Sequence, residues 1–440
     1  MSDLHAAFAL FNDSSEDENE ELEQCVQKAI LHRNKTSSSI SQVEKKDEDD
    51  DQHLKKEEEC IRRESQKALH CFVKHAPLYM GPMALDMDMK LGGARGYVAL
   101  HDLQPGTLLL REQVLVPWPV KKDAHLFVDT VAKILEDEKC DEIIQAMKEL
   151  YPKNLDDLPK ELLQAGLEEY TAALQTILDT TSSPYSSTME TLLQLVFAMQ
   201  SNAFQSGVFL NSSIFNHACL SNCVKFQCPE NPSISEVRAC RFIAAGEALN
   251  INYLSPCEQL KTTRQKQLFE QFGFICICPR CLSESDTPAE FLTLEKQVLL
   301  IEQQEEASVP ERVLATTLDL FSDALEMMSH DNMMLMRIHR LVANSCVQLL
   351  DHVNPQFLEH AILYLRSSVE LLDLQKQYLP QDHLDLTRTL KDISNGIQML
   401  LSYDPEILYA EFPEWATFKC ASHAENTFRQ QYLRLRSLYE

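Results

Sequence analysis

Glycine and basic residues are scarce in this 440-residue chain. Only 10 glycines occur, which argues against nucleotide-binding folds that depend on glycine-rich loops. The 40 lysine and arginine residues are outnumbered by 67 acidic residues, and the formal net charge is −27. A protein that binds nucleic acid through bulk charge needs an excess of basic side chains, so we expect no direct nucleic-acid binding. An acidic balance instead favours a basic partner, such as a lysine-rich protein segment.

Long apolar runs are also missing, and we expect no secretory leader. No stretch of 18 apolar residues occurs, so we expect no transmembrane helix and no membrane partner. The first residues lack a basic segment and soon turn acidic, which is not typical of a signal peptide. The 14 cysteines are irregularly spaced, as in reducing compartments where thiols stay free or bind metal. We expect a monomer located in the nucleus, the cytoplasm or both.

Most of the chain has the composition of a globular protein. Hydrophobic residues make up 44% and charged residues 24%, and the length suits two or three domains. The exception is an acidic tail, residues 1–65, of which the first 60 contain 17 acidic and 7 basic side chains. Such a segment repels itself and buries little, so we expect it to be mostly disordered, with at most a transient helix over 21–31. The tail either only confers solubility or also engages basic partners.

Short strands and a helical insertion alternate between residues 84 and 254. Strands are predicted on both sides of the turn at Gln104-Pro105-Gly106, and again at 224–227, 236–243 and 249–253. From about 120 to 200 the apolar spacing is helical. Two buried helix faces are expected: Leu126, Val131, Ile134 and Leu135 form one, and Leu192, Leu193, Leu195, Val196 and Met199 form the other.

The region from 286 to 440 has no strand pattern. Amphipathic segments follow one another and are broken at Pro310, Asn354-Pro355, Pro380 and Asp404-Pro405. This spacing predicts paired antiparallel helices. They form either an array resembling tetratricopeptide (TPR) repeats or a plain bundle that supports the neighbouring domain.

Three cysteines lie within six residues in the run Cys276-Ile-Cys278-Pro-Arg-Cys281. Such clustering is rare outside metal sites, although a set of unrelated buried thiols is the alternative. Zinc takes thiolates in tetrahedral geometry, and a structural site needs four ligands. The spacing does not choose the fourth among Cys219, Cys223, Cys228 and Cys257. A site closed by four thiolates has no open position for water and is structural.

Three other segments indicate a function only when they are considered together, in their order along the chain. They are Gly93-Ala-Arg-Gly-Tyr-Val-Ala99, Asn216-His-Ala-Cys-Leu-Ser-Asn222 and Gly246-Glu-Ala-Leu-Asn-Ile-Asn-Tyr253. Taken singly, they are more typical of a turn, a polar turn and a core strand. Together with the cysteine cluster that follows them, they resemble the SET-domain protein-lysine methyltransferases, specifically the SET-and-MYND subgroup. The resemblance covers about 84–285 well and 286–440 more loosely.

The resemblance implies an α+β fold: a SET-type β-clip of short strands at 84–254 with the helical insertion at about 120–200. A post-SET zinc segment follows at 255–285, and an all-α, TPR-like domain at 286–440. It implies S-adenosylmethionine as the cofactor, structural Zn²⁺, and a protein substrate with an accessible lysine, a histone or another protein. Tyr253 corresponds to the catalytic tyrosine, and Cys219 completes the zinc site of Cys276, Cys278 and Cys281. The cofactor positions implied by the resemblance are Gly93, Arg95, Gly96, Tyr97, Asn202, Ser213, Phe215, Asn216, His217, Tyr253 and Phe274.

These residue types suit methyl transfer to an amine. The reaction is an in-line displacement, so alignment does much of the work. The lysine must be neutral although its ordinary pKa is about 10.4, and an apolar aromatic channel disfavours the ammonium form. Phe204, Phe209 and Phe215 are candidate channel walls. Tyr253 would orient the amine.

The chain also departs from the family pattern. Residues 116–123 run on without the cysteines of a MYND zinc module, so no MYND module is expected. The residues at Gly93, Ala94, Ala218 and Ser221 differ from the usual ones, which motivates an alternative: a catalytically weak SET-fold scaffold that binds basic partners through its helical domain and acidic tail. A third hypothesis is a zinc-stabilised histone-binding protein or chaperone that works through the tail. We favour the enzyme, because none of these changes removes Tyr253 or the thiols.

Overall fold

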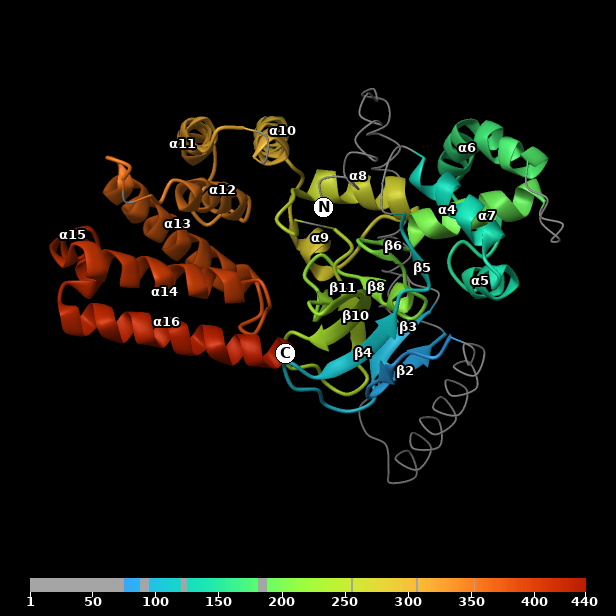
Figure 1. The fold of residues 1–440 in the computed structure, drawn as a ribbon, viewed down its shortest axis with the longest axis horizontal. Coiled ribbons are helices and arrows are strands. Elements are labelled where there is room, and N and C mark those ends of the chain that lie inside the picture. Colours follow the sequence, from blue (N-terminus) through green and yellow to red (C-terminus); the bar gives the residue numbers. More distant parts are fainter. Residues whose placement is uncertain are drawn as a thin grey trace, which may run out of the picture.

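The computed structural model describes residues 75–87, 95–119, 125–180, 188–254, 256–305, 308–351 and 353–440. The predicted acidic tail and Gly93 lie outside the described residues. Within them, short strands form the centre of the molecule, one helical group covers one end, and a second helical group extends from the other (Figure 1). Among the described helices, none is long and apolar enough to cross a membrane.

Three small sheets make up the strand region. The first has the order β1-β4-β10-β9, the second β2-β3-β11-β8 and the third β5-β7-β6. The strands are β1 Tyr79–Met80, β2 Met83–Asp86, β3 Gly96–Ala99, β4 Leu108–Gln113, β5 Val116–Pro117, β6 Ala203–Phe204, β7 Gly207–Val208, β8 Asn216–His217, β9 Cys223–Cys228, β10 Asn231–Ala239 and β11 Ala248–Ile251.

The strand predictions are largely confirmed, with two shifts at their boundaries. Strand pairing begins at Tyr79, before residue 84, because Tyr79 and Met80 pair with Arg111 and Leu110. The strand predicted at 236–243 instead covers Asn231–Ala239. This strand pairs with β9 from Asn231 to Ala239, and beyond its end Ile243 forms an isolated bridge with Leu103.

The helical insertion lies between β5 and β6 and covers one end of the strands (Figure 1). Both predicted helix faces are buried, which confirms the assignment from apolar spacing. A hydroxyl cap starts the last of these helices, since Thr188 Oγ1 accepts from the backbone N–H of Thr191 at 3.2 Å. The helices are α4 Leu126–Glu136, α5 Cys140–Met147, η3 Leu155–Asp157, α6 Lys160–Thr180 and α7 Met189–Ser201, with η4 Ser212–Ile214 following β7.

The C-terminal region is helical throughout, and helices adjacent in sequence pack on one another. The predicted breaks are helix boundaries: Pro310 begins α11 and Pro405 begins α15, where Asp404 caps the N-terminus. The TPR-like repeat stays a prediction. The helices are α8 Lys261–Phe272, α9 Pro279–Ser283, α10 Ala289–Gln304, α11 Pro310–Met327, α12 Leu335–Gln348, α13 Phe357–Tyr378, α14 Leu386–Tyr403, α15 Pro405–Glu411, η5 Pro413–Trp415 and α16 Phe418–Tyr439.

The last helix returns to the strand region. In Figure 1, α16 runs from the far end of the helical domain back to the strands, where the chain ends. Tyr439 packs edge-on against Phe226 of β9, with ring centres 5.9 Å apart. Arg238 of β10 donates to the carbonyl of Gly106 at 3.0 Å and to that of Leu438 at 3.5 Å. The C-terminal end of α16 therefore packs against β9 and β10 and supports these two strands.

Candidate active site and metal centre

The three motif segments meet in one sheet. β3 of the first pairs with β11 of the third, which also pairs in parallel with β8 of the second. Asn216 adds a side-chain link, because its amide donates to the carbonyl of Arg95 at 3.0 Å. Asn222 adds another, accepting from the backbone N–H of Asn250 at 2.8 Å. Segments far apart in the sequence thus form a single site, as their order predicted.

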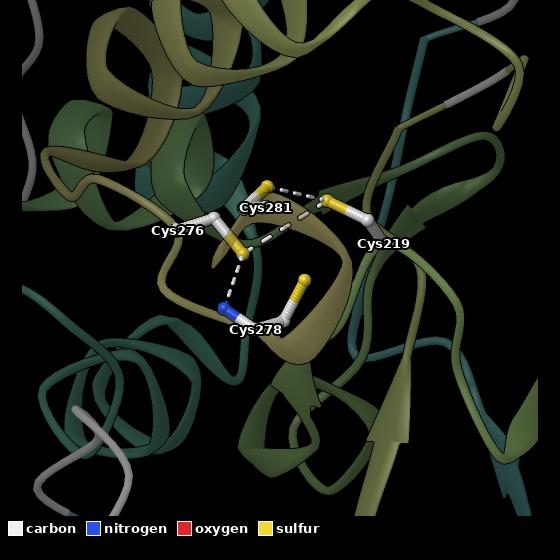
Figure 2. Close-up of side chains that lie close together, drawn as sticks. All are labelled: Cys219, Cys276, Cys278 and Cys281. Carbon is white, nitrogen blue, oxygen red and sulfur yellow. Dashed lines mark hydrogen bonds between the residues drawn. The ribbon is translucent and has the colours of Figure 1, made fainter. Parts of the chain in front are cut away.

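Four thiols converge beside this sheet. The sulfur atoms of Cys219, Cys276, Cys278 and Cys281 all lie within 4.8 Å of one another, and Figure 2 shows their side chains pointing to a common centre. Cys219 Sγ is 3.5 Å from Cys281 Sγ and 3.9 Å from Cys276 Sγ. A tetrahedral zinc with Zn–S bonds of about 2.3 Å has sulfur–sulfur edges of about 3.8 Å. The cluster therefore fits zinc, and Cys219 is the fourth member.

Hydrogen-bond donors surround the thiols. The buried Arg264 of α8 lies with Nε 3.3 Å from Cys219 Sγ and Nη2 3.5 Å from Cys281 Sγ. Its Nη2 also donates to Glu284 at 2.6 Å. A guanidinium at this place offsets part of the negative charge that four thiolates carry when they hold a divalent ion. Such outer partners orient ligands and tune metal affinity.

His217 joins the metal centre to Tyr253. The imidazole Nδ1 accepts from the backbone N–H of Tyr253 at 3.1 Å, and Nε2 lies 3.3 Å from Cys219 Sγ. Because Nδ1 accepts, Nε2 carries the proton and donates to the sulfur. Burial lowers the pKa of His217 to about 4, so the ring is neutral.

Tyr253 lines a cavity of about 230 Å³. Its hydroxyl donates to the carbonyl of Phe215 at 2.6 Å, which fixes the phenol. Phe272 packs against its ring at 4.9 Å between centres, and Phe204 lies on another part of the wall. Burial raises the pKa of Tyr253 well above its ordinary value, so the phenol keeps its proton.

A lysine shares this cavity. Lys225 of β9 is half-buried, and its Nζ lies 4.0 Å from the ring centre of Phe204 and 4.4 Å from that of Phe209. Burial lowers its pKa to about 7, and the more distant carboxylate of Glu112 only partly opposes this. Burial thus disfavours the charged form of this amine, whereas the faces of the two aromatic rings attract it.

The predicted cofactor residues fall into two groups. Asn202 and Ser213 line the cavity, although their polar groups are engaged: the amide of Asn202 donates to the carbonyls of Tyr151 and Ala198, and Ser213 Oγ donates to the carbonyl of Phe209. Tyr253 lines the cavity as well, and the remaining described ones lie around the sheet. Tyr97 is fully buried, and its ring packs against that of Phe215 at 4.8 Å between centres.

The first motif is held mainly through its backbone. Gly96 is buried in β3, and the guanidinium of Arg95 donates to the carbonyl of Glu149. Phe274 lies 6.1 Å from His217 and 6.3 Å from Tyr253, measured between ring centres. The cofactor roles of Arg95, Gly96 and Phe274 stay predictions.

Three residues of the site were not singled out from the sequence. Lys225 lies in a strand that was predicted, but no motif marks its side chain. The family resemblance indicates Phe274 and not Phe272, whereas Phe272 is the residue that lines the cavity. Arg264 lies on a helix 12 residues before Cys276, and no local pattern indicates that it folds onto the thiols.

Comparison with known proteins identifies the motif region. The sequence model of the SET domain matches residues 94–254. The chain contains a SET domain. The match covers strands β3 to β11 and the helical insertion, in agreement with the fold expected from the motifs.

Several curated proteins resemble parts of the chain. Human "Protein-lysine N-trimethyltransferase SMYD5" is 39% identical over 89 residues, covering 20% of this chain and 21% of that protein. "Histone-lysine N-methyltransferase SET5" of Vanderwaltozyma polyspora is 35% identical over 96 residues, covering 22% and 19%. Human "Histone-lysine N-methyltransferase SMYD3" is 30% identical over 175 residues, covering 37% and 38%. The chain thus spans about a fifth of the length of the first relatives that it matches.

Among solved structures, the SET domain of LSMT bound to lysine and AdoHcy matches 84% of this chain and 92% of that one. The TM-score is 0.34 and the identity 12%.

Proposed function

We propose that the protein is an S-adenosylmethionine-dependent protein-lysine N-methyltransferase. The observation that carries the proposal is the position of Tyr253, on an aromatic-walled cavity at the point where the three motif segments of the SET domain meet. The names of the curated relatives support the same reaction class.

The residues around the sheet suit the cofactor. The resemblance assigns to it the backbone of Arg95 to Tyr97, the amide of Asn216 and the ring of Phe274. Asn216 already bridges the first and second motifs, and Phe274 adds an aromatic face beside His217. When bound, S-adenosylmethionine supplies an electrophilic methyl group on a sulfonium sulfur.

The cavity favours a neutral amine. Aromatic walls at Phe204 and Phe272 replace water around an entering side chain and disfavour its ammonium form. Lys225 lines the same cavity, and burial lowers its pKa to about 7, in line with this expectation. A substrate lysine that enters would lose its proton for the same reason.

Tyr253 would align the reaction. The hydrogen bond to the carbonyl of Phe215 holds its hydroxyl in one orientation. Fixed oxygen atoms at this place orient the amine and stabilise the positive charge near the methyl group without having to reorganise during transfer. The protonated, neutral phenol is suited to this positioning role.

The substrate we propose is a protein with an accessible lysine. SMYD3 and SET5 are named for histone lysines and SMYD5 for protein lysines; a histone or another protein is therefore the class to test. The net charge of −27 favours substrates rich in basic residues. The scaffold alternative has less support, because Tyr253 and the cavity are both present.

The test is transfer of labelled methyl from S-adenosylmethionine to proteins of a hypomethylated cell extract, with Tyr253→Phe assayed in parallel. We expect lysine methylation by the wild type and a loss of roughly 10²–10³-fold in the variant, the usual cost of removing one aligned hydroxyl or N–H group from a reacting centre. Full activity of Tyr253→Phe would contradict the role of the hydroxyl. Absence of transfer by folded, zinc-loaded protein with every extract and with histones would contradict the proposed function.

A further inference from the structure

The cavity beside Tyr253 already contains a lysine of the chain itself. Lys225 extends from β9 and lines the same wall as Phe204 and Tyr253. Its Nζ rests against two aromatic rings, at 4.0 Å and 4.4 Å from their centres. The aromatic environment that a methyltransferase must create for a substrate amine thus already surrounds the amine of Lys225.

The amine of Lys225 has no hydrogen-bond or ion-pair partner among the residues that the structure describes. The charged group acting on it is Glu112 of β4, which accepts instead from the backbone N–H groups of Asn211 and Ser212 at 2.9 Å and 3.0 Å. An ammonium in such a place lacks the hydrogen bonds it would make in water. Burial therefore favours the unprotonated amine, which is the nucleophilic form, against the attraction of the two ring faces for the cation.

Lys261 is the natural comparison. It is also half-buried, but its Nζ donates to the carbonyl of Glu284 at 2.9 Å and pairs with Asp286 at 3.4 Å. Its amine thus has a hydrogen-bond acceptor and an ion-pair partner, and Lys261 lies outside the residues that line the cavity. Partial burial alone therefore does not distinguish Lys225; its aromatic surroundings, its missing partners and its place beside Tyr253 do.

We propose that Lys225 is a methyl acceptor of its own active site and that the protein methylates itself at this position in cis. The step rests on the proposed function. The amine lone pair of Lys225 attacks the methyl carbon of S-adenosylmethionine, and a C–N bond forms. The C–S bond breaks with its electron pair moving to sulfur, which leaves S-adenosylhomocysteine, and the proton of the amine passes to water.

The sequence makes the modification easy to locate. Lys225 is the only lysine between Lys160 and Lys261, so any methyl-lysine found in residues 161–260 is on Lys225. The full-length protein is incubated with S-adenosylmethionine and no other protein, digested with chymotrypsin, and mapped by mass spectrometry. We expect methyl on Lys225 in the wild type and in Lys261→Arg, and none at this position in Tyr253→Phe. Lys261 itself stays unmodified.

Dilution and mixing test whether transfer occurs in cis. The fraction of Lys225 methylated at a given time should not depend on protein concentration. A tagged Tyr253→Phe chain mixed with untagged wild type should stay unmodified at Lys225, because its amine lies inside its own cavity. Equal labelling of the tagged chain would overturn the proposal.

A readout without cofactor tests the amine directly. Trace acetylation with acetic anhydride over a range of pH measures the reactive, neutral fraction of each lysine. We expect Lys225 to reach half of its maximal reactivity near neutral pH, well below the ordinary lysine value of 10.5. Reactivity that follows the exposed lysines would contradict the neutral amine on which the proposal depends.

The failures of the two proposals are distinguishable. If the wild type methylates extract proteins or histones but Lys225 stays unmodified, self-methylation is wrong and the proposed function stands. If nothing is methylated, in cis or in other proteins, both fail. Methylation confined to lysines outside residues 161–260 also contradicts the assignment to Lys225.

Discussion

His217 accepts a hydrogen bond at Nδ1 from the backbone N–H of Tyr253 and presents its other nitrogen to a thiol of the metal centre. One neutral ring thus spans the space between the tyrosine and Cys219. Through this ring, the four-thiol site helps to fix the segment just after β11 that carries the phenol of Tyr253. Both contacts are made by a residue of the second motif.

Two substitutions of His217 separate these contacts. The Asn side chain in His217→Asn retains an acceptor for the N–H of Tyr253, whereas His217→Leu removes both contacts. We expect methyl transfer to fall roughly 10–100-fold in His217→Leu, in line with the loss of other outer-sphere partners, and less in His217→Asn. Zinc content should stay at one per chain in both, since all four thiols remain. Equal activity of wild type and His217→Leu would show that the link is dispensable.

The zinc site is predicted to be structural. Cys278→Ser should reduce bound zinc well below one per chain and lower the melting temperature by at least about 5 °C, because binding of a structural metal contributes directly to the free energy of folding. The matched control is Cys420→Ser, since this thiol is exposed and lies outside the cluster. Metal analysis and thermal unfolding measure both effects. A zinc-free wild-type protein with unchanged stability would contradict the assignment.

A buried ion pair stabilises the helical domain and its junction with the SET domain. Arg337 of α12 is 2% exposed and donates to Glu302 at 2.6 Å and to Glu295 at 3.3 Å, both on α10. Glu295 also accepts from the backbone N–H of Leu260 at 2.8 Å, just before α8. Removing the cation leaves the buried carboxylate of Glu295 without the charged group that pairs with it.

We therefore expect Arg337→Met to lower the free energy of unfolding by about 3–5 kcal/mol, the cost of breaking a buried pair by removing one partner. Arg366→Met removes a pair with Glu411 in which both side chains are exposed, and it should cost at most about 1 kcal/mol. Urea unfolding of both variants measures the difference. Similar losses in the two would contradict the importance of burial.

The strand-and-helix plan and the four thiols could be predicted because each has a local signal. Apolar spacing identified the buried faces of α4 and α7, and the cysteine run identified the metal centre. The sequence alone left the fourth thiol open, because only folding brings Cys219 back to Cys281 across 62 residues.

The side-chain environment of the cavity could not be predicted in the same way. Lys225 resembles any polar residue in a short strand, and its surroundings depend on Phe204 and Phe209, which arrive on a separate hairpin. Arg264 likewise reaches the thiols only because α8 packs across them. Such contacts arise from tertiary packing, which leaves no periodic trace in the sequence.

The depressed pKa of Lys225 predicts a pH-dependent stability. The lysine has a pKa of about 7 in the folded protein and an ordinary value of 10.5. Between these values the unfolded chain binds more protons than the folded one, so this group makes the free energy of unfolding rise with pH, by up to about 1.4 kcal/mol per pH unit. Below pH 7 both states carry the proton and the contribution is constant, with the folded state bearing the cost of a buried charge.

Lys225→Met isolates this contribution, because it keeps the apolar length of the side chain and removes the amine. Urea unfolding at several pH values from 6 to 10 should give a difference between wild type and variant that shrinks as pH rises above 7, with Met the more stable at low pH. Tyr253 is common to both proteins. Burial raises the pKa of the Glu112 carboxyl and the charge of Lys225 opposes this rise, so the difference between the two proteins reports the titration of this coupled pair. A difference that is independent of pH would mean that Lys225 titrates as an ordinary lysine, and the neutral amine in the cavity would have to be abandoned.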